Sequence, residues 1–104
     1  NMIIYNVTLN VDDDVHADWI QWMRKAHIPE VMATGYFREA RFTKVLVQEE
    51  SGTTYSIQYL AESMAQLQSY QQHAAPQLMQ QTVERFGSKV VAFRTLLEVQ
   101  EVFH

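Results

Sequence analysis

The chain has 104 residues, 47% of them hydrophobic and 19% charged, a composition typical of one folded domain with its own core. Its net charge of −4 disfavours a nucleic-acid surface, because such surfaces gather Lys and Arg against phosphates. The absence of cysteine excludes disulfides, thiolate nucleophiles and zinc–sulfur sites. No segment approaches the roughly 18 consecutive apolar residues that span a bilayer, and no secretory signal is visible. We therefore expect one cytoplasmic domain over residues 2–104, with no membrane and no nucleic acid as partner.

The beginning of the chain predicts a strand followed by a helix. Residues 3–11 alternate between apolar and mixed side chains, with many β-branched residues, as strands do. Three aspartates at 12–14 suit a helix start, where carboxylates cap free amides and meet the positive end of the dipole. Apolar residues then recur at helical spacing from Val15 to Ala26. Pro29 disfavours helical geometry at the residue before it, so the helix is expected to end near Ile28.

The middle of the chain predicts a pair of strands. Gly35 marks a turn after the first helix, and residues 36–47 form a strand candidate. Residues 48–52 are polar and contain a glycine, which favours a hairpin loop. Residues 53–61 alternate again, with tyrosines and an isoleucine on one face, and predict the third strand.

The last third of the chain predicts a second helix and a fourth strand. Ser63 with Gln66 fits a capping box, so a helix should begin there. Pro76 should kink or restart this helix, and Gly87 is a natural stop. Residues 89–102 alternate and are rich in β-branched side chains, which predicts a strand. The resulting βαββαβ order is typical of an α+β, ferredoxin-like fold, in which two helices cover one face of a four-stranded antiparallel sheet.

Two helices cover only one face of such a sheet, so the other face must be polar or covered by something else. If Phe93, Thr95, Leu97 and Val99 face the helices, the second face mixes apolar and polar side chains. Its members are then Ile4, Asn6, Thr8, Asn10, Thr54, Ser56, Gln58, Leu60, Ala92, Arg94, Leu96 and Glu98. This face is either solvated or packs against a partner sheet around a small polar cavity.

Motifs along nearly the whole chain resemble one family of uncharacterised small bacterial proteins, the domain of unknown function 4286. The motifs are Met2-Ile3-Ile4-Tyr5-Asn6-Val7, Trp19 with Trp22-Met23, the segment 27–35 that begins His27-Ile28-Pro29-Glu30, the segment 54–59, Arg85-Phe86-Gly87 and the segment 92–98. That family has no established activity. More distantly it resembles the dimeric α/β barrels, which include cofactor-free monooxygenases, lactone isomerases and haem-degrading enzymes. The resemblance implies a homodimer and favours the sheltered second face.

His27 and Glu30 are the candidate catalytic pair. A histidine beside a carboxylate can serve as a general base with the group that orients it. The alternative is structural, with His27 at the C-terminus of the first helix and Glu30 either solvated or paired with Arg24.

Five polar residues in predicted strands are candidate ligand-binding groups. Arg41, Gln58 and Arg94 lie within strands, where burying an unpaired charge is costly. An anionic or carbonyl-bearing metabolite in the cavity would explain the arginines, with Asn6 and Thr8 adding hydrogen bonds. The alternative is an ion pair, for example from Arg94 to Glu98 or Glu39.

No cofactor and no metal site is expected. The four histidines, at 16, 27, 73 and 104, show no recognised ligand spacing. The aromatic and methionine side chains are assigned to the core.

Three functions remain open: a ligand-binding or regulatory homodimer with a polar cavity between its sheets, a cofactor-free enzyme of monooxygenase or isomerase type with His27 as the base, and a structural or protein-interaction dimer without a ligand.

Overall fold

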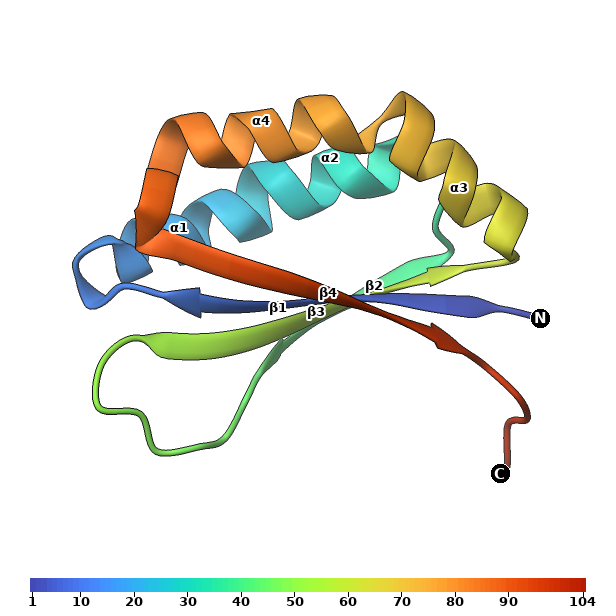
Figure 1. Ribbon diagram of the computed structural model, residues 1–104, viewed down its shortest axis with the longest axis horizontal. Helices are drawn as coiled ribbons and strands as arrows, with labels where there is room; N and C mark the ends of the chain where they lie inside the picture. Colours follow the sequence, from blue (N-terminus) through green and yellow to red (C-terminus); the bar gives the residue numbers. More distant parts are fainter.

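The computed structural model describes residues 1–104 as an antiparallel sheet with every helix on one side (Figure 1). The elements are β1 (Ile3–Val11), α1 (His16–Trp22), α2 (Ile28–Ala33), β2 (Glu39–Lys44), β3 (Thr53–Ala61), α3 (Met64–His73), α4 (Ala75–Phe86) and β4 (Val90–Glu98). A π-helical turn, η2 (Met23–His27), joins α1 to α2, and the 3-10 turns η1 (Asp13–Val15) and η3 (Gly87–Lys89) precede α1 and β4. The predicted ferredoxin-like α+β fold is confirmed. None of the helices has the length and apolar character needed to cross a membrane.

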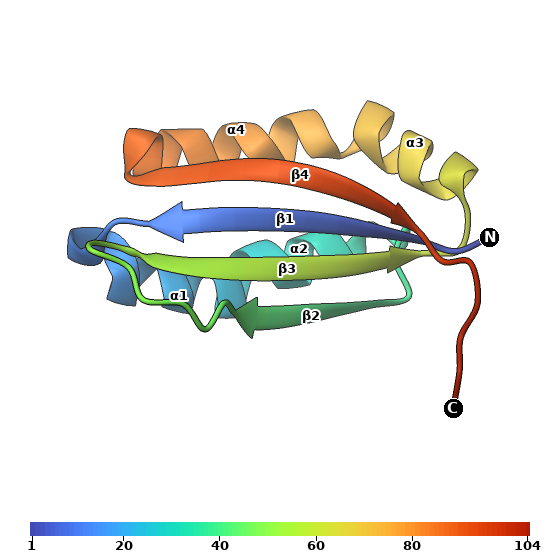
Figure 2. The ribbon, with the colours of Figure 1, turned by 60° about the horizontal axis from the view of Figure 1, so that its bottom comes forward.

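The sheet order is β2-β3-β1-β4, with β4 and β2 at the two edges (Figure 2). The central strand β1 pairs along its whole length with both β3 and β4. Its odd-numbered residues face the helices and are buried, as are alternate residues of β3. Around them Trp19 and Leu67 are completely buried, so the core lies between the helical layer and the middle of the sheet.

The prediction that Pro29 ends the first helix is wrong. Ile28 has helical dihedrals, and α2 continues to Ala33 with Pro29 in its first turn. In a regular α-helix the proline ring would clash with the carbonyl four residues earlier. The wide turn η2 replaces that geometry, and the Ile28 N–H donates to the Met23 carbonyl, five residues back. The helix therefore passes through the proline instead of stopping at it.

The outer two strands are shorter than predicted. Residues 36–38 belong to the turn after Gly35, whose φ of 81° suits glycine, and they bring Phe37 into the core. Residues 45–47 leave the sheet after the Val45 N–H donates to the Thr54 carbonyl, and Leu46 is 89% exposed. At the other edge the ladder ends with the Val99 N–H donating to the Met2 carbonyl.

The assignment of the faces of β4 is also wrong. Val90 pairs with Val11, Arg94 with Val7 and Glu98 with Ile3, so the even-numbered residues of β4 share the helix side with the buried face of β1. Val91, Phe93 and Leu97 lie on the opposite face, and they are 65%, 64% and 47% exposed. Arg94 therefore leaves the bare face of the sheet, and large apolar side chains take positions on it.

The second helical stretch follows the predicted signals. The Gln66 N–H donates to the Ser63 hydroxyl, which caps α3. The helix breaks at Ala74, whose φ is −124°, and restarts as α4 with Pro76 in its first turn. Gly87, with a φ of 55°, ends α4 and turns the chain into β4.

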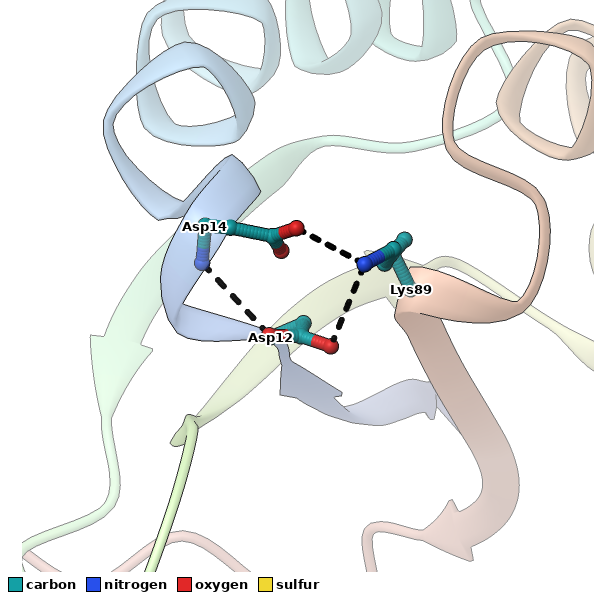
Figure 3. A network of polar contacts seen from close by, with 3 residues as sticks. All are labelled: Asp12, Asp14 and Lys89. Carbon is teal, nitrogen blue, oxygen red and sulfur yellow. Dashed lines mark hydrogen bonds and ion pairs between the residues drawn. The ribbon is translucent and has the colours of Figure 1, made fainter.

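An ion-pair network joins the end of β1 to the α4–β4 connection (Figure 3). The Lys89 ammonium lies 2.7 Å from Asp14 Oδ2 and 3.8 Å from Asp12 Oδ2. The hydrogen bond from Lys89 to Asp14 lowers the pKa of Asp14 and raises the pKa of Lys89. The carboxylate contributes stability that is lost as the pH falls below its usual range. The ammonium contributes stability that is lost as the pH rises through its raised pKa.

Replacing Lys89 with methionine should lower the melting temperature slightly at neutral pH and low ionic strength. The network is solvent-exposed, so salt should screen it. Melting curves at low and at molar salt measure the effect, and the wild-type protein and the variant should converge at high salt. A difference that persists undiminished at high salt would show that Lys89 stabilises the fold by packing rather than by charge.

Candidate functional site

A cavity of about 240 Å³ lies between the helical layer and the sheet. Its floor comes from β1, β3 and β4, and its walls come from η2, α3 and α4. Most of its lining is hydrophobic, including Val7, Leu78, Met79 and Ala92. The side chains that carry a polar group are Tyr5, His27, Tyr59, Tyr70, Thr82 and Arg94.

His27 is held at the cavity wall by the π-helical turn. Wide turns of this kind are frequent at functional sites. Its ring stacks on Trp22 at a centroid distance of 4.8 Å. The Nδ1 atom is buried and has no hydrogen-bond partner. Burial, helped by the positive charge of Arg94, lowers the pKa of His27 to about 4, so the imidazole is neutral at pH 7.

Three tyrosines on the cavity side of the core bring their rings together. Tyr5 lies 6.1 Å from Tyr59 and 5.8 Å from Tyr70, measured between ring centroids. Burial raises the pKa of Tyr59 and of Tyr70 well above the usual value, and the neighbouring phenols add to the shift. The hydroxyls of Tyr59 and Tyr70 therefore stay protonated and can donate hydrogen bonds across the neutral pH range.

Arg94 brings the one formal positive charge to the cavity. Its Nε donates to the Tyr5 hydroxyl at 2.9 Å. It forms no ion pair with Glu98 or Glu39; the Glu98 carboxylate accepts from Gln100, and Glu39 pairs with Arg41. The lining contains no Asp, Glu or Lys. Arg94 is consequently a cation next to an apolar cavity without a carboxylate to balance it.

The structure separates the predicted ligand-binding residues onto two faces. Asn6, Thr8, Arg41 and Gln58 share the bare face of the sheet, whereas Arg94 is on the helix side. On the bare face the Asn6 amide donates to Thr8 and accepts from Ser56, so these groups largely satisfy one another. The shallow hollow beside them, lined in part by Arg41 and Gln58, has a volume of about 130 Å³.

Glu30 does not reach His27. It lies exposed on α2 and lines hollows on the outer side of the helices, apart from the cavity. No carboxylate partners the Nδ1 atom of His27, so the predicted pairing of base and orienting group is absent. No cluster of three or more His, Asp or Glu side chains is placed to hold a metal ion.

The tyrosine hydroxyls are the site groups that the sequence analysis missed. Tyr5 and Tyr59 occupy inward-facing strand positions and were assigned to the core. The available signal was the choice of residue, because a phenylalanine would fill the same space without burying a hydroxyl.

Solved structures share this arrangement at low sequence identity. An ethyl tert-butyl ether degradation (EthD) family protein from Bacillus halodurans is 12% identical, with a TM-score of 0.71 over 94% of this chain and 99% of its own. A Deinococcus radiodurans protein provisionally assigned to antibiotic biosynthesis monooxygenases is 13% identical, with a TM-score of 0.71 over 98% and 96%. A dimeric ferredoxin-like protein of unknown function from Thermobifida fusca is 15% identical, with a TM-score of 0.60 over 93% and 92%. At such identities the likeness establishes the fold.

The fold and the cavity thus define a ferredoxin-like α+β domain with a largely apolar cavity beneath its helices. None of the curated proteins compared with the chain matches it. The chain belongs to the family described as "Domain of unknown function (DUF4286)", whose family model matches residues 2–100.

Proposed function

We propose that the protein is a homodimeric small-molecule-binding module whose ligand occupies the cavity beneath α4. The observation that carries this proposal is the unbalanced polar lining of the cavity. Arg94 and His27 both line it, no carboxylate pairs with the Arg94 guanidinium, and the buried Nδ1 of His27 has no hydrogen-bond partner. Arg94 is exposed in the single chain and is therefore solvated there, but a ligand that filled the cavity would displace this water, and an anionic or carbonyl oxygen on the ligand would offset the cost.

The homodimer is supported by the bare face of the sheet. Helices cover the opposite face only (Figure 1), and Val91, Phe93 and Leu97 expose apolar surface on the uncovered side. Two structural neighbours are themselves described as dimeric ferredoxin-like proteins. In this arrangement Asn6, Thr8 and Gln58 would lie in the interface, so a ligand role for them stays a prediction that depends on the partner sheet.

Binding of 2-naphthoate, followed by its fluorescence, tests the proposal. We expect saturable binding to the wild-type protein and loss of binding in Ala92→Phe, because Ala92 lines the cavity and a phenyl ring there would fill it. Ala65→Phe is the matched control, since Ala65 lies exposed on α3 and should leave binding unchanged. Absence of saturable binding, or equal binding by Ala92→Phe, would contradict the proposal and favour a structural dimer without a ligand.

A cofactor-free enzyme is the second candidate, and it is favoured by His27 alone. A neutral imidazole with an unpaired ring nitrogen at a cavity wall can accept a proton from a bound substrate. In this candidate His27→Gln would retain ligand binding and lose turnover. Retention of turnover by His27→Gln would show that His27 is not the base.

A further inference from the structure

Resting on the proposed function, we propose that the cavity selects an aromatic carboxylate of one or two rings. The carboxylate would pair with Arg94, and the rings would fill the apolar space under α4.

The charge of the cavity specifies an anion. Three of the other arginines, Arg38, Arg41 and Arg85, each pair with a carboxylate of the protein. Arg94 instead uses only its Nε, toward Tyr5, which leaves the outer nitrogens of the guanidinium for a ligand. The two outer nitrogens present parallel N–H groups, which match the two oxygens of a carboxylate. A neutral ligand would leave the cation without a counter-charge.

The other titratable groups that face Arg94 and His27 do not supply that counter-charge. They are Tyr5 on β1, Tyr59 on β3 and Tyr70 on α3; burial keeps Tyr59 and Tyr70 protonated, and His27 itself is neutral. Arg85, whose guanidinium lies 5.9 Å from the centroid of the Trp22 ring, is outside the lining and pairs with Asp18. An incoming carboxylate would thus meet one cation and several hydroxyl donors, and no like charge.

The size and lining of the cavity favour rings. An apolar cavity of about 150 Å³ accepts benzene, so about 240 Å³ has space for one to two fused rings. The thioethers of Met23 and Met79 and the rings of Tyr59 and Tyr70 line the space, and both kinds of group contact aromatic ligands favourably.

Calorimetric titration with 2-naphthoate and 2-naphthamide tests the charge selection on the wild-type protein. The two probes have nearly the same shape and differ in charge. We expect 2-naphthoate to bind about 10- to 100-fold more tightly, the range for a paired charge-assisted hydrogen bond. Equal affinity of the two probes would overturn the selection for an anion while leaving the cavity as a binding site. Failure of both probes to bind would overturn the proposed function as well.

Substitution of Arg94 assigns the preference to one residue. Arg94→Gln should remove the 10- to 100-fold preference, so that 2-naphthoate and 2-naphthamide bind with similar affinity. Arg41→Gln is the matched control, because Arg41 is a strand arginine on the opposite face and should keep the preference. A preference that survives in Arg94→Gln, or disappears in Arg41→Gln, overturns the assignment. Decanoate, a flexible acid, should bind at least about tenfold more weakly than 2-naphthoate, and equal binding would overturn the aromatic part of the proposal.

Discussion

Replacing Phe93 with glutamate should convert the protein from a dimer into a monomer at micromolar concentration. Phe93 is 64% exposed in the single chain and lies on the bare face of the sheet, across from Thr8. In a two-fold dimer the substitution acts twice. Each copy loses about 2 kcal/mol of apolar burial and would place a carboxylate in the interface. The combined loss of at least about 4 kcal/mol corresponds to roughly 1,000-fold weaker association.

Sedimentation of the wild-type protein and of the variant measures this effect against a chain mass of 12.2 kDa. Met64→Glu provides the control, because Met64 is 40% exposed but belongs to α3 in the helical layer. It should sediment as the wild-type protein does. A wild-type protein that sediments as a monomer, or a Phe93→Glu variant that remains a dimer, would refute the proposal that the bare face is the subunit interface.

The parts of the fold that the sequence predicted well are set by local signals. The bounds of β1 and β3 follow from alternation over nine residues, and both strands have neighbours on each side. The start of α3 follows from Ser63, whose hydroxyl caps the helix by accepting a hydrogen bond from the Gln66 amide three residues later. In each case the residues that carry the signal also form the structure, so no distant partner has to be known.

The errors arise where the structure around a residue overrides a rule based on its neighbours in sequence. Pro29 does break a regular α-helix, but the π-helical turn before it absorbs the clash, and nothing in the residue pattern marks that turn. Alternation shows that Phe93 and Leu97 share one face of β4, but it does not show whether that face is the helix side. Because β4 is an edge strand, its register with β1 decides the face, and that register joins residues some ninety positions apart.

The candidate site shows the same division. His27 and Arg94 were both singled out by their chemistry, but they were placed in different sites, and the structure brings them to one cavity. Glu30 is close to His27 in sequence, yet it lines hollows that are separate from the cavity beside His27. The phenols of Tyr59 and Tyr70 could not be distinguished from ordinary core residues until the strand register and the helix packing were known.

Replacing His27 with glutamine should make the stability of the protein less sensitive to acid. In the folded protein the pKa of His27 is lowered to about 4, against about 6.5 in an unfolded chain. Below pH 6.5 the unfolded state therefore binds a proton at His27 that the folded state does not bind. The free energy of unfolding consequently falls until the pH reaches about 4. The loss from this one group is on the order of 3 kcal/mol. Glutamine cannot take up the proton, so this part of the acid sensitivity should be absent from the variant.

Urea unfolding at pH 7 and at pH 4 measures the difference, and His73→Gln provides the control because His73 is exposed on α3. The free energies of unfolding of the wild-type protein and of His27→Gln should approach each other by about 2 to 3 kcal/mol on acidification, since the carboxylates titrate alike in both. His73→Gln should follow the wild-type curve at both pH values. Parallel curves for the wild-type protein and His27→Gln would mean that His27 is solvated and charges freely. A histidine of that kind would leave Nδ1 bonded to water and without need of a ligand, so the same result would also weaken the case for the cavity as a binding site.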